Sequence, residues 1–198
     1  MRRFWVMTAV LWLVLSPGMA RADDAAVVIR TLSDHAIGIL SGTPQSSQER
    51  KVKLETLLEE AMDLPFVGQF VMGRYWRQLD ADQQTAYQKA FRRYVLNLYA
   101  GQLNGYSGEL FQVLGSRAVD DKDSIVSSQL VRKDRAPVEV DWRVRGTNGK
   151  FKVIDVSVEG VSMALTQRQE FASIVQREGV EGLIKRLSTP PHDPGPPK

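Results

Sequence analysis

The chain contains no cysteine and only two histidines, His35 and His192. Without cysteine, neither disulfide bonds nor thiolate zinc sites can form, and a lipoprotein anchor is excluded as well. Transition-metal sites usually recruit clusters of histidine or cysteine, so a metal-dependent enzyme is not expected. The sequence also lacks the Gly-x-Ser-x-Gly elbow of many hydrolases and the Gly-rich Walker loop of ATP-binding proteins.

The sequence has no apolar run long enough to span a membrane, and its one marked apolar run is a short segment near the start of the chain. Arg2 and Arg3 precede an apolar segment over 4–15, and Ala20-Arg21-Ala22 supplies the small-x-small pattern of a cleavage site. We interpret residues 1–22 as a secretory signal peptide, because the apolar run is too short for a stable membrane-spanning helix. The mature protein is then expected to begin near Asp23 and to be located in the periplasm.

An excess of positive charge is absent from this expected mature chain. The leader holds three of the 26 basic residues and none of the 23 acidic ones, so its removal leaves the two signs balanced. A neutral chain does not attract phosphate backbones as a whole, and nucleic acid is not an expected partner. The remaining length suits a single domain over 23–187, followed by a Pro-rich tail over 188–198 that we expect to be disordered.

The first half of the mature chain shows the apolar spacing of helices. The patterns predict helices over 27–40 and 46–62, a third that begins near Pro65, and a long fourth that follows Asp80. The second half changes to strands, predicted over 109–119, 124–133, 137–145 and 150–158, before a helical pattern returns after Gly160.

The third predicted strand has a strict two-residue period. Val138, Val140, Trp142 and Val144 alternate with charged residues, which indicates one buried face and one solvated face. Helices first, antiparallel strands next and a helix last indicate an α+β fold. We expect the helices to pack on one face of a twisted, mainly antiparallel sheet of four to five strands.

Aromatic and aliphatic side chains are dense on the long helices and on the facing strand. They either fill a solid core or line an apolar cavity between the helices and the sheet, and periodicity does not separate these alternatives. The candidate cavity-lining residues are Phe70, Val71, Tyr75, Phe91, Tyr94, Val95, Leu98, Tyr99, Val140, Trp142, Val144, Val156, Met163 and Phe171.

Two sequence motifs resemble a known family. The segment 70–77, Phe-Val-Met-Gly-Arg-Tyr-Trp-Arg, and the segment 154–163, Ile-Asp-Val-Ser-Val-Glu-Gly-Val-Ser-Met, are similar in order and spacing to the MlaC family, as are Arg168 and Phe171. Gln167 is a departure, because the family commonly has tyrosine at this position. The resemblance covers roughly residues 25–187.

The resemblance implies a phospholipid carrier of the Mla transport system, which is also linked to toluene tolerance. It implies that the acyl chains of a glycerophospholipid lie between helices and sheet, with the head group near solvent, and that no cofactor is needed. The implied partners are an outer-membrane lipoprotein–porin complex and an inner-membrane ABC transporter with an MCE-domain protein. The carrier is expected to act as a monomer that maintains outer-membrane lipid asymmetry.

Charged residues offer further candidate contacts. Arginines at 74, 77, 92, 93 and 168 either meet lipid phosphate or acidic partner surfaces, or are simply solvated. Asp155, in an apolar strand, is more consistent with a structural hydrogen bond than with acid–base catalysis. The acidic turn over 120–123 lacks the ligand spacing of a calcium loop.

Two other functions stay open at this stage. A periplasmic chaperone or adaptor would have a solid core without a cavity. A small hydrolase would need titratable groups in the cavity, for which the sequence offers mainly Asp155 and Glu159.

Overall fold

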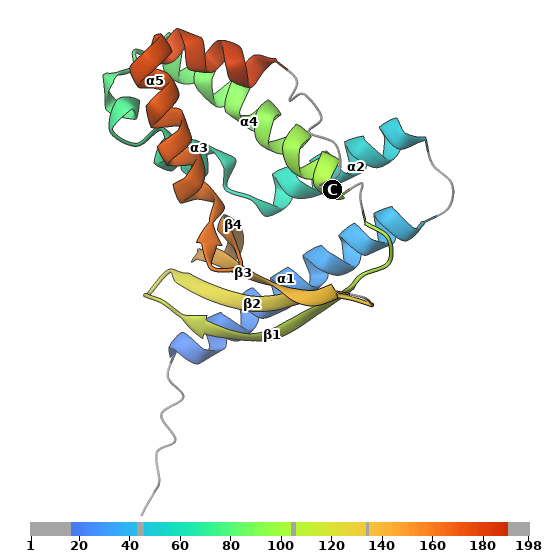
Figure 1. The fold of residues 1–198 in the computed structure, drawn as a ribbon. Helices are drawn as coiled ribbons and strands as arrows, with labels where there is room; N and C mark the ends of the chain where they lie inside the picture. The colour runs from blue at the N-terminus through green and yellow to red at the C-terminus, as the bar shows by residue number, and fades with distance from the viewer. Residues whose placement is uncertain (1–16, 43–45, 104–105, 134, 190–198) are drawn as a thin grey trace, which may run out of the picture.

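A computed structural model describes residues 17–42, 46–103, 106–133 and 135–189 (Figure 1). The helices are α1 (Pro17–Ser41), α2 (Ser47–Ala61), α3 (Leu64–Met72), the 3₁₀ helix η1 (Gly73–Gln78), α4 (Ala81–Leu103) and α5 (Met163–Ser188). The strands are β1 (Leu110–Ala118), β2 (Asp123–Arg132), β3 (Arg135–Thr147), β4 (Lys150–Val158) and β5 (Val161–Ser162).

The five strands form one antiparallel sheet in the order β1-β2-β3-β4-β5. Consecutive strands are neighbours, so each connection is a local hairpin. Between β3 and β4, Asn148 and Gly149 both have positive φ angles, of 51° and 74°. Two such residues match the right-handed twist of the flanking strands. The predicted α+β fold class is therefore confirmed, with β5 as a short additional edge strand.

Helix α1 covers one face of the sheet (Figure 1). Its Ala25, Ala26 and Ile29 are buried against Val126 and Val144 of the sheet, and Val153 of β4 completes this group. We call these six residues the sheet cluster. The small side chains of Ala25 and Ala26 allow the helix to approach the strands closely, and the larger Ile29 packs beside them.

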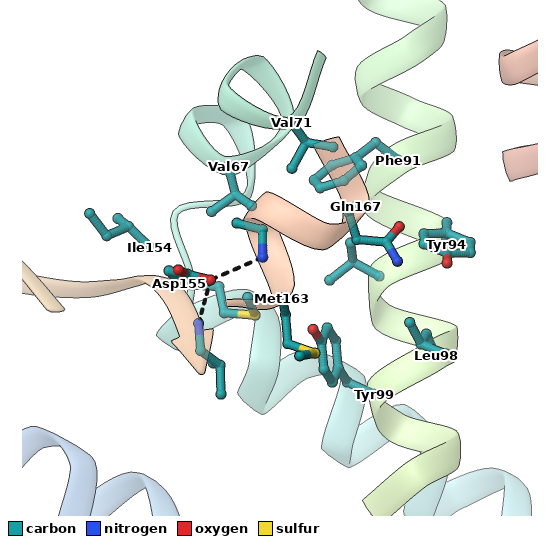
Figure 2. Close-up of a pocket in the computed structure, with 14 residues that line it drawn as sticks. Val67, Val71, Phe91, Tyr94, Leu98, Tyr99, Ile154, Asp155, Met163 and Gln167 are labelled. Atoms are coloured by element: carbon teal, nitrogen blue, oxygen red, sulfur yellow. Dashed lines mark hydrogen bonds between the residues drawn. The ribbon is translucent and has the colours of Figure 1, made fainter. Parts of the chain in front are cut away.

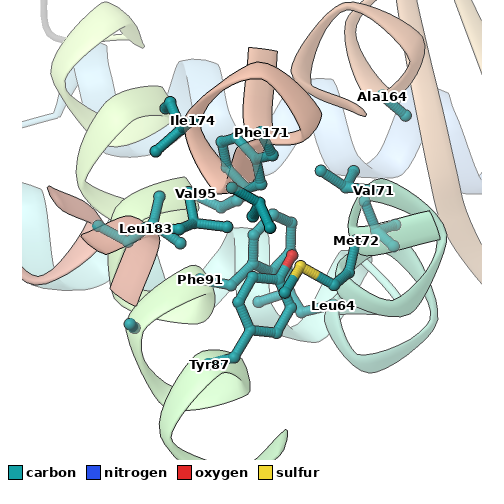
Figure 3. Packing of buried hydrophobic residues seen from close by; sticks show 14 of the residues in the cluster. Leu64, Val71, Met72, Tyr87, Phe91, Val95, Ala164, Phe171, Ile174 and Leu183 are labelled. Atoms are coloured by element: carbon teal, nitrogen blue, oxygen red, sulfur yellow. The ribbon is translucent and has the colours of Figure 1, made fainter. Parts of the chain in front are cut away.

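A second core lies where α3, α4 and α5 meet (Figure 3). We call it the helical cluster, and its aromatic centre consists of Tyr87, Phe91 and Phe171, which are at most 2% exposed. The ring centroids of Tyr87 and Phe91 lie 5.8 Å apart, and Phe171 meets Phe91 edge-on at 6.3 Å. Such arrangements add about 1 kcal/mol per pair to the burial of apolar surface.

Helix α5 changes direction at Gly179, whose φ of 71° and ψ of 178° are not helical. The segment after this kink returns toward the helical cluster, where Leu183 and Leu187 are buried. Arg186 binds Glu178 across the kink, with Nη2 2.6 Å from Oε1. Glycine tolerates this backbone conformation because it has no Cβ atom.

The two clusters meet at Met62, which packs against both. The chain between α2 and α3 forms an isolated bridge with β4, where the Asp63 amide donates to the Val153 carbonyl at 3.0 Å. Asp63 also begins α3, because its Oδ1 accepts from the Phe66 amide at 3.1 Å. These bonds hold the start of α3 against β4.

The predicted leader and tail lie mostly outside the described residues, which omit 1–16 and 190–198. Helix α1 continues through the predicted cleavage site before Asp23. None of the described helices combines the length and apolar composition of a membrane-spanning segment.

Candidate functional site

An apolar pocket lies at the junction between the helical cluster and β4 (Figure 2). Its lining residues are Met62, Val67, Val71, Phe91, Tyr94, Val95, Leu98, Tyr99, Ile154, Asp155, Val156, Met163, Ala164 and Gln167. Helices α3, α4 and α5 contribute most of this wall, and β4 closes it. The open volume is about 30 Å³, which holds a few water molecules at most.

A β-bulge in β4 directs side chains toward this pocket. Arg143 of β3 pairs with Asp155 whereas the next residue, Val144, pairs with Val153, so Ile154 has no partner on β3. The extra residue reverses the usual alternation at this point. Val153 and Val156 consequently both pack with the sheet cluster, while Ile154 and Asp155 between them line the pocket.

The carboxylate of Asp155 is engaged in local hydrogen bonds. Its Oδ1 accepts from the Val156 amide at 2.8 Å and the Ala164 amide at 3.0 Å (Figure 2), and its Oδ2 accepts from the Ser162 hydroxyl at 2.6 Å. Ser162 in turn caps α5 by accepting from the Leu165 amide. Asp155 therefore fixes the first turn of α5 to β4, which fits a structural role for this side chain.

Glu159, the other carboxylate considered for catalysis, joins β4 to β3. Its Oε1 accepts from the Glu139 amide at 2.6 Å, and its own amide donates to the Glu139 carbonyl at 3.0 Å. It does not line the pocket. Among the described residues, no group of three or more histidines or carboxylates has the arrangement of a metal site.

Two tyrosines bring hydroxyl groups to the pocket. Burial raises the pKa of Tyr99 to about 12, and the nearby charge of Asp155 adds to the rise. Burial also raises the pKa of Tyr94, and the negative charge of Glu170 adds to the rise. A hydrogen bond with the Gln167 side chain acts in the opposite direction. Both phenols are therefore protonated at neutral pH and available as hydrogen-bond donors.

The structure brings eight of the fourteen predicted cavity residues together around this pocket. These residues are Val71, Phe91, Tyr94, Val95, Leu98, Tyr99, Val156 and Met163. Most of them come from α4, whose regular apolar spacing made this side of the helix recognisable in the sequence. Their contact with lipid stays a prediction.

The other six predicted residues lie elsewhere. Trp142 and Val144 pack with the sheet cluster under α1, and Val140 is half-buried on the same strand. Phe171 is enclosed in the helical cluster. Phe70 and Tyr75 pack partly buried against the outside of that cluster.

Six lining residues were not predicted, namely Met62, Val67, Ile154, Asp155, Ala164 and Gln167. Helical spacing gave a signal for Val67, which precedes Val71 by one turn of α3. The alternation of the strand places Ile154 opposite Val153, but the sequence does not show that this side of β4 meets the helices. Ala164 and Gln167 are small or polar and do not stand out in a search for apolar faces.

The arginines considered as phosphate or partner contacts are spread over the surface. Arg92 forms an ion pair with Glu59 of α2. Arg168 lies over the ring of Phe70, and Arg74 donates to the Tyr75 hydroxyl at 2.9 Å. Arg77 and Arg93 are exposed. No arginine lines the pocket.

Comparison with known proteins places this geometry in context. The family model described as MlaC protein matches residues 30–189. The intermembrane phospholipid transport system binding protein MlaC of Haemophilus influenzae is 23% identical over 193 residues, which cover 93% of this chain and 90% of the relative. The toluene tolerance protein ttg2D of Pseudomonas putida is 25% identical over 127 residues, which cover 64% of this chain and 59% of the relative.

A solved structure has the same architecture. The phospholipid-binding protein of Ralstonia solanacearum, determined in complex with a phospholipid, is 28% identical and superimposes with a TM-score of 0.72. The match covers 82% of this chain and 94% of that protein. The family model spans the described domain from α1 to the end of α5, and on that extent of similarity the chain belongs to the MlaC family.

Proposed function

We propose that this protein is a periplasmic carrier that encloses the acyl chains of a glycerophospholipid and moves the lipid between the two membranes without chemical change. The observation that carries the proposal is the apolar pocket between the helical cluster and β4. Support comes from the family membership and from the Ralstonia relative, whose structure contains a phospholipid.

The energetics of lipid transfer explain why such a pocket is needed. Each methylene group removed from water contributes roughly 0.8 kcal/mol, so two chains with about 30 methylenes represent on the order of 20 kcal/mol. Free diffusion of a lipid through water is therefore prohibitively slow. A carrier that covers the tails removes most of this barrier, and it does so with apolar contacts and no catalytic group.

The pocket must widen to accept a tail, since 30 Å³ is far less than the volume of an acyl chain. The junction of the two clusters is the natural place for this change. On the β4 side, the lining consists of Ile154, Asp155 and Val156, and α4 and α5 form the opposite side. A displacement of α4 away from β4 would open the pocket without separating the paired strands or breaking the bonds that hold α3 and α5 to β4.

Within this proposal, the carrier exchanges lipid with an outer-membrane lipoprotein–porin complex and an inner-membrane ABC transporter bearing an MCE-domain protein. This exchange maintains outer-membrane lipid asymmetry, and the carrier acts as a monomer. Release requires that each docked partner provides the acyl chains with an apolar environment comparable to the pocket, because transfer of the chains into water is unfavourable.

A second candidate is a periplasmic adaptor or chaperone with a solid core. The small pocket volume favours this candidate, since an adaptor that binds no lipid needs no larger cavity between the helices and β4. The enzyme alternative has less support, because both candidate carboxylates are held by local hydrogen bonds.

Lipid extraction and native mass spectrometry of protein purified without detergent test the carrier. We expect about one phospholipid per chain. Leu98→Trp, which fills the pocket, should lower lipid content while the protein remains folded. Val140→Trp is the control, because Val140 lies outside the pocket and should not affect lipid content. A lipid-free wild-type protein that also takes no lipid from vesicles would favour the adaptor.

A further inference from the structure

Three of the five candidate arginines gather around η1, although the set as a whole is spread over the surface. Arg74 and Arg77 are three residues apart in this 3₁₀ helix, and its three-residue turn places them on the same side. Arg168 of α5 reaches η1 as well, because its guanidinium group covers Gly73 at the start of that helix. All three arginines are exposed. We call Arg74, Arg77 and Arg168 the basic surface.

Aromatic rings hold two of these guanidinium groups in place. The guanidinium carbon of Arg74 lies 5.0 Å from the centre of the Tyr75 ring, and its Nη2 donates to the Tyr75 hydroxyl at 2.9 Å. Arg168 lies over the ring of Phe70, at 5.1 Å from its centre. A cation on an aromatic face keeps its charge and most of its N–H donors. The two groups are therefore partly ordered before an anion binds, which lowers the entropic cost of binding.

No carboxylate neutralises the basic surface within the described part of the chain. None of its three arginines forms an ion pair there, whereas Arg92 of α4 and Arg186 of α5 both do. Asp80, which follows η1, accepts the hydrogen bond that begins α4. Glu170 is two positions from Arg168 and therefore points from another side of α5. The surface thus carries an unbalanced positive charge, although the expected mature chain is neutral as a whole.

Apolar side chains project from the neighbouring start of α5. Leu165 precedes Arg168 by one turn on the same side of the helix and is 51% exposed. Val161 in β5, directly before α5, is 54% exposed. Exposed apolar side chains beside basic groups are the combination that binds a membrane surface, because the apolar groups enter the interface while the cations attract anionic lipids.

The basic surface and the pocket are built on the same elements. Gln167, which lines the pocket, is adjacent to Arg168 in α5, and Val71, which also lines it, precedes Arg74 by three residues. Figure 1 shows α3 and α5 next to each other, with α1 on the sheet away from them. A membrane bound at the basic surface would therefore lie beside the wall that α3 and α5 give to the pocket.

We propose that the basic surface, with Leu165 beside it, docks the protein directly on a membrane that contains anionic phospholipid. Lipid phosphates are mobile and adjust to guanidinium groups from two separate elements, whereas an acidic protein would need carboxylates fixed in matching positions. The inference does not require that the protein carries lipid. It gives the proposed carrier a contact with the bilayer itself, in addition to its protein partners.

Vesicle flotation measures this contact. The purified protein is incubated with vesicles of phosphatidylcholine alone, or of phosphatidylcholine and phosphatidylglycerol in equal amounts, and the fraction that floats is determined. We expect binding to the mixed vesicles and its loss at high salt. Each arginine near an anionic bilayer strengthens binding about 5-fold, so Arg74→Gln/Arg77→Gln should weaken it about 25-fold. Arg168 is left in place because it packs on Phe70.

Three further variants make the result interpretable. Arg93→Gln/Arg117→Gln removes the same charge from exposed positions on α4 and β1 and should bind like the wild type. Arg74→Lys/Arg77→Lys should retain most of the binding, because a bilayer responds to charge and not to the fork of the guanidinium group. Leu165→Ser should weaken binding without changing its salt dependence. Urea unfolding establishes that each variant is folded.

The outcomes separate docking from lipid carriage. Equal binding of the wild type to both kinds of vesicle, or an equal loss in Arg93→Gln/Arg117→Gln and Arg74→Gln/Arg77→Gln, would overturn the docking surface. Absence of vesicle binding would overturn it too and would leave an acidic protein as the partner. Native mass spectrometry of the same preparation measures bound lipid. Lipid without vesicle binding leaves the carrier intact, and vesicle binding by a protein that takes up no lipid contradicts the carrier alone.

Discussion

Arg168 lies across the face of Phe70, with its guanidinium carbon 5.1 Å from the ring centroid, and the same side chain covers Gly73. A Cβ atom at Gly73 would lie 2.9 Å from Nε of Arg168. Gly73 also has a φ of 58° and a ψ of −128°, which side chains rarely permit. Phe70 and Gly73 belong to the family-like segment 70–77, and Arg168 is a further match to the family in α5. Two parts of the sequence that carry the resemblance are therefore in contact.

Replacement of Gly73 by alanine should therefore destabilise the fold. The backbone strain and the contact with Arg168 together should lower the free energy of unfolding by about 2 kcal/mol, measured in urea. Gly101→Ala in α4 is the matched control, because nothing lies within 4 Å of its Cβ position. That variant should be neutral or more stable by up to about 1 kcal/mol. Equal stability of both variants would contradict the assigned strain.

The helices and strands were largely predictable from the sequence because their signals are local. The cap residues Asp63 and Asp80 mark the beginnings of α3 and α4, and the predicted strand over 150–158 coincides with β4. These signals depend on neighbours within one turn or one strand. The kink at Gly179 was not predicted, since glycine is also tolerated within a continuous helix.

The partner of each buried face was less predictable. The alternation of Val140, Trp142 and Val144 gives the correct buried side of β3, but α1 covers that side, and α4 does not. Periodicity identifies an apolar face without naming what packs on it. The pocket itself depends on which side of β4 meets the helices and on the position of Met62, and both arise from tertiary contacts.

Ser128 should matter for stability through its contact with Trp142. Its hydroxyl accepts from the Trp142 indole at 2.9 Å and donates to the Val140 carbonyl at 2.8 Å. Ser128→Ala leaves the indole N–H without this acceptor and should cost about 1–3 kcal/mol in urea unfolding. Ser127→Ala, the adjacent half-buried serine, should have a much smaller effect.

A double-mutant cycle isolates this contact. In the Ser128→Ala background, Trp142→Phe should cost less than it does in the wild type, because the hydrogen bond is already lost. Strictly additive costs would show that Ser128 and Trp142 contribute independently, in conflict with the assigned bond.

The predicted leader gives a simple measurement on the exported protein. Signal peptidase should cleave after Ala22, so the mature chain should begin at Asp23 and lose Arg2, Arg3 and Arg21. Intact-mass spectrometry of periplasmic extracts measures this directly. Ala22→Pro should block processing and leave the full-length precursor. Recovery of unprocessed wild-type chain from the periplasm would contradict the leader.

Asp123 should make the stability of the sheet sensitive to acid. The residue is 1% exposed, and its carboxylate binds Arg145 at 2.7 Å and Arg143 at 2.8 Å. Burial alone raises the pKa of Asp123, but the hydrogen bonds from Arg145 and Arg143 outweigh it and hold the pKa below its usual value.

A lowered pKa in the folded state fixes the sign of the pH dependence. The stabilisation by Asp123 is fully present above the unfolded pKa of about 4 and is lost as the pH falls through the lower folded value. Urea unfolding of the wild type between pH 7 and pH 2.5 should show this loss. Asp123→Asn should be less stable by about 2 kcal/mol at pH 7 and should lose less stability in acid. The exposed neighbour Asp121 provides the control Asp121→Asn, which should follow the wild-type profile. If Asp123→Asn and the wild type lost the same stability in acid, other carboxylates would be responsible for the acid sensitivity of the fold.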